Sequence, residues 1–214
     1  MSMRTELKLP RVYPITDVEI SGISHAEQIV LLADGGASFV QLREKKLPAL
    51  DFYHHAKTAI TVAVERGVRI IINDRIDIAL AVGAIGVHLG QDDLPPEEAR
   101  KLLGNDAIIG YSTHTVSQAI AASSLPVDYL AIGPIFKTGT KANPDPVVGL
   151  EGLRVVRKAI GDMRLVAIGG ITPENAGGVV EAGADTVAVI SSLLSGGRTA
   201  IAQRYRAFTA VLPE

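Results

Sequence analysis

The feature that most restricts the fold of this chain is an eightfold alternation of short β-branched segments with longer amphipathic ones. The predicted strands are residues 12–15, 39–42, 69–72, 86–89, 107–109, 129–132, 165–168 and 186–190, and the helices between and after them include 25–33, 50–66, 96–103, 116–122, 150–160, 173–182 and 198–211. Repeated strand-then-helix order implies parallel strands joined by right-handed crossovers. Eight regular units favour a (β/α)8 TIM barrel, of the α/β class, over an open doubly wound sheet.

Composition narrows the classes of function. The chain of 214 residues has 21 Lys+Arg against 23 Asp+Glu, a net charge of −2, which argues against a basic surface for nucleic acid. It has no cysteine, which excludes disulfides, thiolate metal sites and a cysteine nucleophile. Since no segment reads as a signal peptide or membrane span, we expect a cytoplasmic protein. We expect one barrel domain over residues 1–214, with residues 1–8 as a short extension.

Glycines and one long connection add detail to this pattern. Glycine stands at 35–36, 83 and 183, where a helix gives way to a strand, and the left-handed conformation that ends a helix suits glycine. The connection 133–148 is the longest stretch without a regular pattern. A loop of that length between strand and helix usually serves as a lid or a binding loop.

The second predicted strand carries the most informative polar residues. Strand side chains alternate between faces, so Val40 and Leu42 face the helices, while Gln41, Arg43 and Lys45 face the barrel mouth. Two unpaired cations there are costly unless an anion neutralises them. The pattern predicts a phosphate or diphosphate clamp; the alternative is a network of ion pairs with carboxylates of the barrel.

Carboxylates follow the next two strands. Asp74 comes after the third strand and Asp93 after the fourth, and Mg2+ often takes only one or two protein carboxylates beside phosphate oxygens. We therefore expect Asp74 and Asp93 to share one Mg2+ per subunit. The alternative is that each aspartate caps the helix that follows it.

The later strand ends offer a second anion site. Gly170 follows the seventh strand, and the eighth ends at Ile190 with Ser191 next, where barrels often hold phosphate on backbone N–H groups. Ser112, Thr138 and Thr140 add hydroxyl groups, and Lys141 adds a cation. No glycine pattern of a nucleophile elbow surrounds Ser112, so a hydrolase triad is not expected. His114 reads either as a hydrogen-bonded wall residue or as an acid–base catalyst.

Together these strand ends resemble the thiamine-phosphate synthase family, also called thiamine-phosphate pyrophosphorylase, along nearly the whole chain. The segments that carry the resemblance are residues 13–17, 41–45, 73–74, 87–93, 110–114, 133–141, 168–171 and 182–191. The resemblance implies a TIM barrel transferase of thiamine biosynthesis. It would join 4-amino-2-methyl-5-hydroxymethylpyrimidine diphosphate to a thiazole phosphate, or its carboxylated form, by a dissociative, magnesium-dependent reaction.

The resemblance also implies roles for individual residues. The pyrimidine diphosphate would be held by Gln41, Leu42, Arg43, Glu44, Lys45, Asn73, Ser112 and Lys141, of which Arg43, Lys45, Ser112 and Lys141 would be catalytic. The thiazole phosphate would be held by Thr138, Gly139, Thr140, Gly170, Ile190 and Ser191, and the magnesium ion by Asp74 and Asp93. The enzyme would bind small phosphorylated molecules, and no nucleic acid or membrane is expected as a partner. A homodimer is possible.

Two alternatives remain at this point. The related thiazole tautomerases share the barrel and use a histidine for proton transfer, and His114 would be that residue here. A barrel that binds thiazole or thiamine phosphate without catalysis is the other. The magnesium and diphosphate residues are complete in this chain, which favours the synthase, because a sensor needs affinity but no activation of a leaving group.

Overall fold

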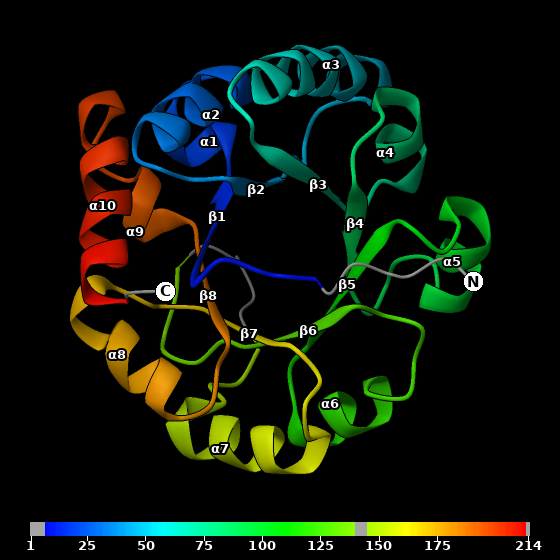
Figure 1. Ribbon diagram of the computed structural model, residues 1–214, viewed down its shortest axis with the longest axis vertical. Coiled ribbons are helices and arrows are strands. Elements are labelled where there is room, and N and C mark those ends of the chain that lie inside the picture. Colours follow the sequence, from blue (N-terminus) through cyan, green and yellow to red (C-terminus); the bar gives the residue numbers. More distant parts are fainter. Residues whose placement is uncertain (1–6, 140–144, 213–214) are drawn as a thin grey trace.

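Eight parallel strands close into a single barrel in the order of the chain (Figure 1). The computed structural model describes residues 7–139 and 145–212. The strands are β1 (Val12–Thr16), β2 (Phe39–Leu42), β3 (Arg69–Asn73), β4 (Gly86–Leu89), β5 (Ile108–Thr113), β6 (Tyr129–Ile132), β7 (Leu165–Ile168) and β8 (Thr186–Val189). Parallel pairing of β1 with β8 closes the ring. The predicted TIM barrel is confirmed.

A layer of helices surrounds the ring of strands (Figure 1). The helices are α1 (Val18–Ser21), α2 (His25–Asp34), α3 (Ala49–Glu65), α4 (Ile76–Val82), α5 (Pro96–Leu103), α6 (Val116–Ala122), α7 (Gly149–Ile160), α8 (Pro173–Glu181), α9 (Ser191–Leu194) and α10 (Ile201–Val211), with a 3-10 turn η1 (Arg198–Ala200) before α10. The sequence did not predict α1 and α9, because four residues are too few to show a helical period. No helix in the described part of the chain is long and apolar enough to span a membrane.

The core has two parts because strand side chains alternate. Val40 and Leu42 of β2 lie in the outer core, between strands and helices, whereas Phe39 lies in a smaller cluster inside the barrel. Leu7 and Leu9 pack against that inner cluster, beside the amino ends of the strands. Apolar packing thus fills the amino end of the barrel and leaves the carboxyl end for polar groups.

The structure corrects the predicted end of β5. This strand was expected to stop at residue 109, but it continues to Thr113, with Gly110 opposite His88 and Ser112 opposite Ala131. Glycine is a poor strand former in isolation, but Gly110 pairs with β4 and β6, and Ser112 pairs with β6, so tertiary pairing overrides the local preference. Ser112 therefore belongs to the barrel wall and not to a loop.

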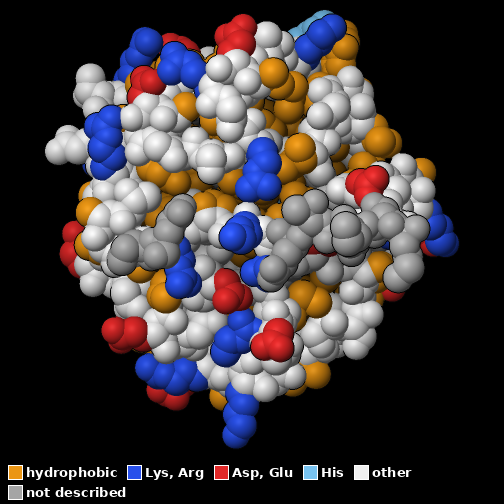
Figure 2. Space-filling view, viewed as in Figure 1, with side chains coloured by type: hydrophobic (Ala, Val, Ile, Leu, Met, Phe, Trp, Pro, Cys, Tyr) orange, Lys and Arg blue, Asp and Glu red, His pale blue; other side chains and the backbone are white. Residues whose placement is uncertain are grey.

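The glycines at three helix-to-strand junctions have the expected conformation. The backbone φ is +103° at Gly36, +70° at Gly83 and +109° at Gly183, so each ends its helix in the region that favours glycine. The expected extension, residues 1–8, lies mostly outside the described residues. On the face shown in Figure 2, basic and acidic side chains are interspersed, which fits the nearly balanced charge.

Candidate active site

A cavity of about 550 Å3 opens at the carboxyl ends of the strands. Every strand contributes at least one lining residue, so the cavity is built on the rigid barrel. A volume in this range suits a small organic ligand. The site lies where the barrel architecture predicts it.

The cations of the predicted clamp line the cavity, and each forms an ion pair. The guanidinium of Arg43 is hydrogen-bonded to the carboxylate of Asp17, and the ammonium of Lys45 to Asp74. The alternative expectation, ion pairs with barrel carboxylates, is thus also observed. The pairing does not remove the two groups from the cavity, because the side chain of Lys45 stays half-exposed.

Asp74 and Asp93 lie together at the cavity wall, and neither caps a helix. Helix α4 starts after Arg75 and α5 after Pro95, without a side-chain cap in either case, while Asp93 Oδ2 accepts a hydrogen bond from the Gly90 N–H at 2.7 Å. Burial raises the pKa of Asp74, the Lys45 ammonium opposes this, and the neighbouring Asp93 adds to it. The two carboxylates therefore repel each other, as expected of a pair that shares a cation.

The structure brings most of the predicted diphosphate residues to one side of the cavity, but not all of them. Gln41, Arg43, Lys45, Asn73 and Ser112 line it. Two others do not. The side chain of Leu42 is buried in the outer core, and that of Glu44 turns to the backbone N–H of Lys46 at 2.8 Å. Lys141 lies outside the described residues.

Asn73 is the clearest sign that a ligand belongs here. It is 7% exposed and lines the cavity between the cations and the aspartates, yet its Nδ2 is buried with no hydrogen-bond partner among the described residues. A buried donor without a partner is costly, so it is expected where a ligand supplies the acceptor.

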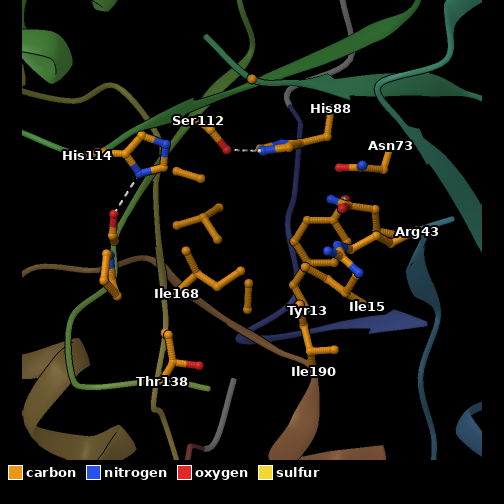
Figure 3. A pocket seen from close by; sticks show the side chains of 18 of the residues that line it. Tyr13, Ile15, Arg43, Asn73, His88, Ser112, His114, Thr138, Ile168 and Ile190 are labelled. Carbon is orange, nitrogen blue, oxygen red and sulfur yellow. Dashed lines mark hydrogen bonds between the residues drawn. The ribbon is translucent and has the colours of Figure 1, made fainter. Parts of the chain in front are cut away.

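A hydrogen-bond chain that the sequence analysis did not find crosses the cavity floor. Gln41 Nε2 donates to the Tyr13 hydroxyl at 3.1 Å, and that hydroxyl lies 3.1 Å from the hydroxyl of Tyr129. The chain continues from Tyr129 to His88 Nδ1 at 3.0 Å. It ends with His88 Nε2 at 2.8 Å from Ser112 Oγ, the contact drawn between these two side chains in Figure 3. The alternation of the strands would have marked His88 and Tyr129 as inward-facing residues, because their strand neighbours are apolar.

A second set of polar side chains, the buried Thr16 and His25 and the partly buried Glu44, lies next to the turn that carries the clamp. Thr16 Oγ1 lies 2.7 Å from His25 Nδ1, and His25 Nε2 lies 3.7 Å from a carboxylate oxygen of Glu44. Burial acts to raise the pKa of Glu44, but N–H groups of Lys46 and Leu47 outweigh it and hold that pKa below its usual value. Glu44 thus organises the turn that carries the clamp, although its side chain does not line the cavity.

These buried histidines predict a stability that depends on pH. Burial lowers the pKa of both His25 and His88 from 6.5 to about 4. The unfolded chain takes up protons below pH 6.5, while the folded chain does not until about pH 4. The free energy of unfolding should therefore decrease as the pH is lowered through this window, by roughly 2 kcal/mol per histidine between pH 7 and pH 5.

Denaturant unfolding at pH 7 and pH 5 measures this loss. The variant His25→Gln should show about half of the pH dependence. The matched control His54→Gln, on an exposed position of α3, should retain all of it. A wild-type free energy of unfolding that is the same at both pH values would contradict the expectation.

The predicted thiazole side is only partly described. Thr138, Gly170, Ile190 and Ser191 line the cavity, and Figure 3 shows Thr138 and Ile190 away from His88 and Asn73. Gly139 is exposed and does not line it, and Thr140 lies outside the described residues. A Cβ at Gly170 would lie 2.6 Å from the Lys137 carbonyl oxygen, so only glycine allows the backbone at 137 and 170 to pack this closely.

His114 has a hydrogen-bonded position. Its Nδ1 donates to the Gly133 carbonyl at 2.8 Å and lies 3.3 Å from a carboxylate oxygen of Asp145, while its own N–H is bound by Gln118 at 2.7 Å. This matches the wall-residue reading. His114 also lines the cavity, so a role in proton transfer stays a prediction.

Comparison with known proteins decides the family. A family model described as thiamine monophosphate synthase matches residues 12–193. The chain belongs to the thiamine monophosphate synthase family. It is 48% identical over 200 residues to a thiamine-phosphate synthase of Koribacter versatilis, covering 90% of this chain and 92% of the relative. A thiamine-phosphate synthase of Clostridium novyi is 46% identical, covering 86% and 90% of the two chains.

A solved structure agrees with this membership. The thiamine phosphate pyrophosphorylase of Pyrococcus furiosus superposes with a TM-score of 0.83 at 33% identity, covering 94% of this chain and 95% of that one. The matched relatives are thiamine-phosphate synthases, and the present chain is an enzyme of this type, a transferase of thiamine biosynthesis. The resemblance deduced from the strand ends is confirmed.

Proposed function

We propose that the enzyme condenses 4-amino-2-methyl-5-hydroxymethylpyrimidine diphosphate with 4-methyl-5-(2-phosphoethyl)thiazole to form thiamine phosphate and pyrophosphate. The carboxylated thiazole would serve with loss of carbon dioxide. One observation carries the proposal: Asn73, whose Nδ2 has no hydrogen-bond partner among the described residues, lines the same cavity as the clamp cations and the carboxylate pair. A ligand bound beside these groups must offer a hydrogen-bond acceptor to Asn73 and a strongly anionic group to the cations. A pyrimidine diphosphate has both.

The residues present fit a magnesium ion. Asp74 and Asp93 offer two carboxylates, and the charge of Asp93 helps to raise the pKa of Asp74, while Lys45 already contributes one positive charge beside Asp74. Within the described residues no cluster of three or more His, Asp or Glu side chains could hold a metal, so this pair would be the protein's share of an oxygen-rich site. When bound, Mg2+ would neutralise charge on the diphosphate and its departing oxygen.

The proposed reaction is dissociative. The bond between the pyrimidine methylene carbon and the diphosphate oxygen breaks, and its electron pair leaves with pyrophosphate. The lone pair of the thiazole nitrogen then forms the new carbon–nitrogen bond. Arg43 and Lys45 would stabilise the charge that develops on the leaving group, and Ser112 would donate a hydrogen bond to it. Such a reaction needs no side-chain nucleophile, and the barrel walls would hold the two rings in line.

Synthesis in vitro tests the proposal. Purified protein is mixed with the pyrimidine diphosphate and the thiazole phosphate, with Mg2+ or with EDTA, and thiamine phosphate is measured. We expect product with Mg2+ and at least roughly a 100-fold slower rate with EDTA. Equal rates would contradict the metal assignment. No product, with thiazole phosphate still bound, would instead favour a tautomerase or a sensor, and His114→Asn would then be the next variant.

A further inference from the structure

The hydrogen-bond chain across the cavity floor can run in only two directions. Its members are Gln41, Tyr13, Tyr129, His88 and Ser112, each within 3.1 Å of the next. Each tyrosine and the serine has only one hydrogen to donate, and a neutral histidine has one N–H and one acceptor nitrogen. The donors of the chain must therefore all point the same way. Reversing any one of them requires reversing all of them.

All members of the chain stay neutral near pH 7. Burial lowers the pKa of His88 to about 4 and raises the pKa values of Tyr13 and Tyr129 above their usual value. Gly110 leaves the room for this packing: a Cβ there would lie 2.4 Å from the Tyr129 hydroxyl and 2.5 Å from His88 Nδ1. This hydrogen-bond chain is therefore part of the packed interior of the barrel, and it links side chains of β1, β2, β4, β5 and β6.

An anion at Ser112 selects one of the two directions. Ionised phosphate oxygens only accept hydrogen bonds, so Ser112 must donate to the anion and accept from His88 Nε2. The proton on Nε2 leaves Nδ1 of the neutral ring as an acceptor for Tyr129. Tyr129 then accepts from Tyr13, and Tyr13 accepts from the Gln41 amide nitrogen. The one link whose donor is fixed by its atoms agrees with this direction, because Gln41 Nε2 donates to the Tyr13 hydroxyl.

We propose that this chain lets an anion bound at Ser112 orient the amide of Gln41, so that its carbonyl oxygen faces the substrate. The inference rests on the proposed function for the identity of that substrate. A carbonyl at Gln41 accepts a hydrogen bond from an amino group and repels a carbonyl group. The diphosphate end of the pyrimidine thus helps the site to select the amino group at the other end. Tyr13, Tyr129 and His88 are positioning residues in this scheme.

Substrate selection in a variant tests the scheme. Tyr129→Phe keeps the ring and cuts the chain in its middle, so the Gln41 amide can turn without changing Ser112. The assay compares kcat/KM for the 4-amino pyrimidine diphosphate with that for its 4-oxo analogue. Lower intrinsic reactivity of the analogue cancels when the ratio in the variant is divided by the ratio in the wild type.

The preference of the wild type for the amino substrate should fall by roughly 10-fold or more in Tyr129→Phe. Tyr13→Phe should have the same effect. Tyr205→Phe is the matched control, because this buried tyrosine lies outside the cavity, with its hydroxyl 3.4 Å from the Val12 carbonyl. This variant should keep the wild-type preference for the amino substrate. Variants that lose activity equally on both pyrimidines would overturn the scheme and leave the tyrosines a purely structural role.

A measurement on the wild-type protein avoids variants that fold poorly. Nitrogen NMR of labelled histidine, with pyrophosphate bound, should show His88 with its proton on Nε2 and a bare Nδ1. The opposite tautomer with pyrophosphate bound would overturn the proposal. This result does not depend on product formation: a protein that binds pyrophosphate but makes no thiamine phosphate refutes the proposed function alone.

Discussion

Replacing Asp74 by asparagine is expected to lower kcat/KM by roughly 100-fold or more while leaving the fold intact. Asp74 has a backbone φ of +61°, in the left-handed region, which asparagine tolerates better than other residues with a side chain. The change removes one negative charge and keeps the shape, so it acts on the cation site and not on the turn. Alanine would add backbone strain at this φ and confuse the two effects.

The Mg2+ dependence of the rate makes this prediction specific. The Mg2+ concentration for half-maximal rate should rise in Asp74→Asn, because one carboxylate of the pair is lost. Asp77→Asn is the matched control: Asp77, in the first turn of α4, pairs with Arg75 just before that helix and is largely exposed, so the variant should keep the wild-type rate. An Asp74→Asn enzyme with wild-type kcat/KM and Mg2+ dependence would remove Asp74 from the metal site.

Replacing Arg43 by alanine should be still more damaging, with a loss of roughly 1,000-fold in kcat/KM for the pyrimidine diphosphate. Two effects add here. The site loses a cation of the clamp, and the Asp17 carboxylate, only 9% exposed as a side chain, is left without its ion pair. An unpaired carboxylate beside the cavity would repel the diphosphate. Inhibition by pyrophosphate should weaken in parallel, because the product binds the same cations.

The double variant Arg43→Ala/Asp17→Asn separates the two effects. It should recover the part of the loss that comes from repulsion and keep the part that comes from the missing cation. Arg66→Ala, which breaks an exposed ion pair with Asp34, should have wild-type kinetics. Unchanged inhibition of Arg43→Ala by pyrophosphate would show that Arg43 is not part of the anion site.

The sequence predicted the faces of the strands but not every contact made from them. Gln41, Arg43 and Lys45 line the cavity as expected from the alternation of β2. The same alternation does not say where a side chain bends after the strand ends, and Glu44 turns back to cap the following turn. Asp17, the ion-pair partner of Arg43, lies 26 positions earlier, so no local pattern joins the two.

The hydrogen-bond chain shows the same limit more clearly. Tyr13 and Tyr129 lie 116 positions apart, and only closure of the barrel brings their hydroxyl groups together. The end of β5 differs from the prediction for a related reason: Gly110 is a strand residue because both β4 and β6 pair with it, and Ser112 because β6 does.

The sequence by itself determined the barrel, the end of it that holds the site and the kinds of charge found there. These follow from periodicity, from glycines at helix ends and from polar residues after strands, all of which act over a few residues. The tertiary structure alone decided which carboxylate pairs with which cation, and that Asn73 Nδ2 is buried without a partner in the described part of the chain. Those are matters of distances of a few ångströms between groups far apart in the chain, which depend on how the closed barrel packs.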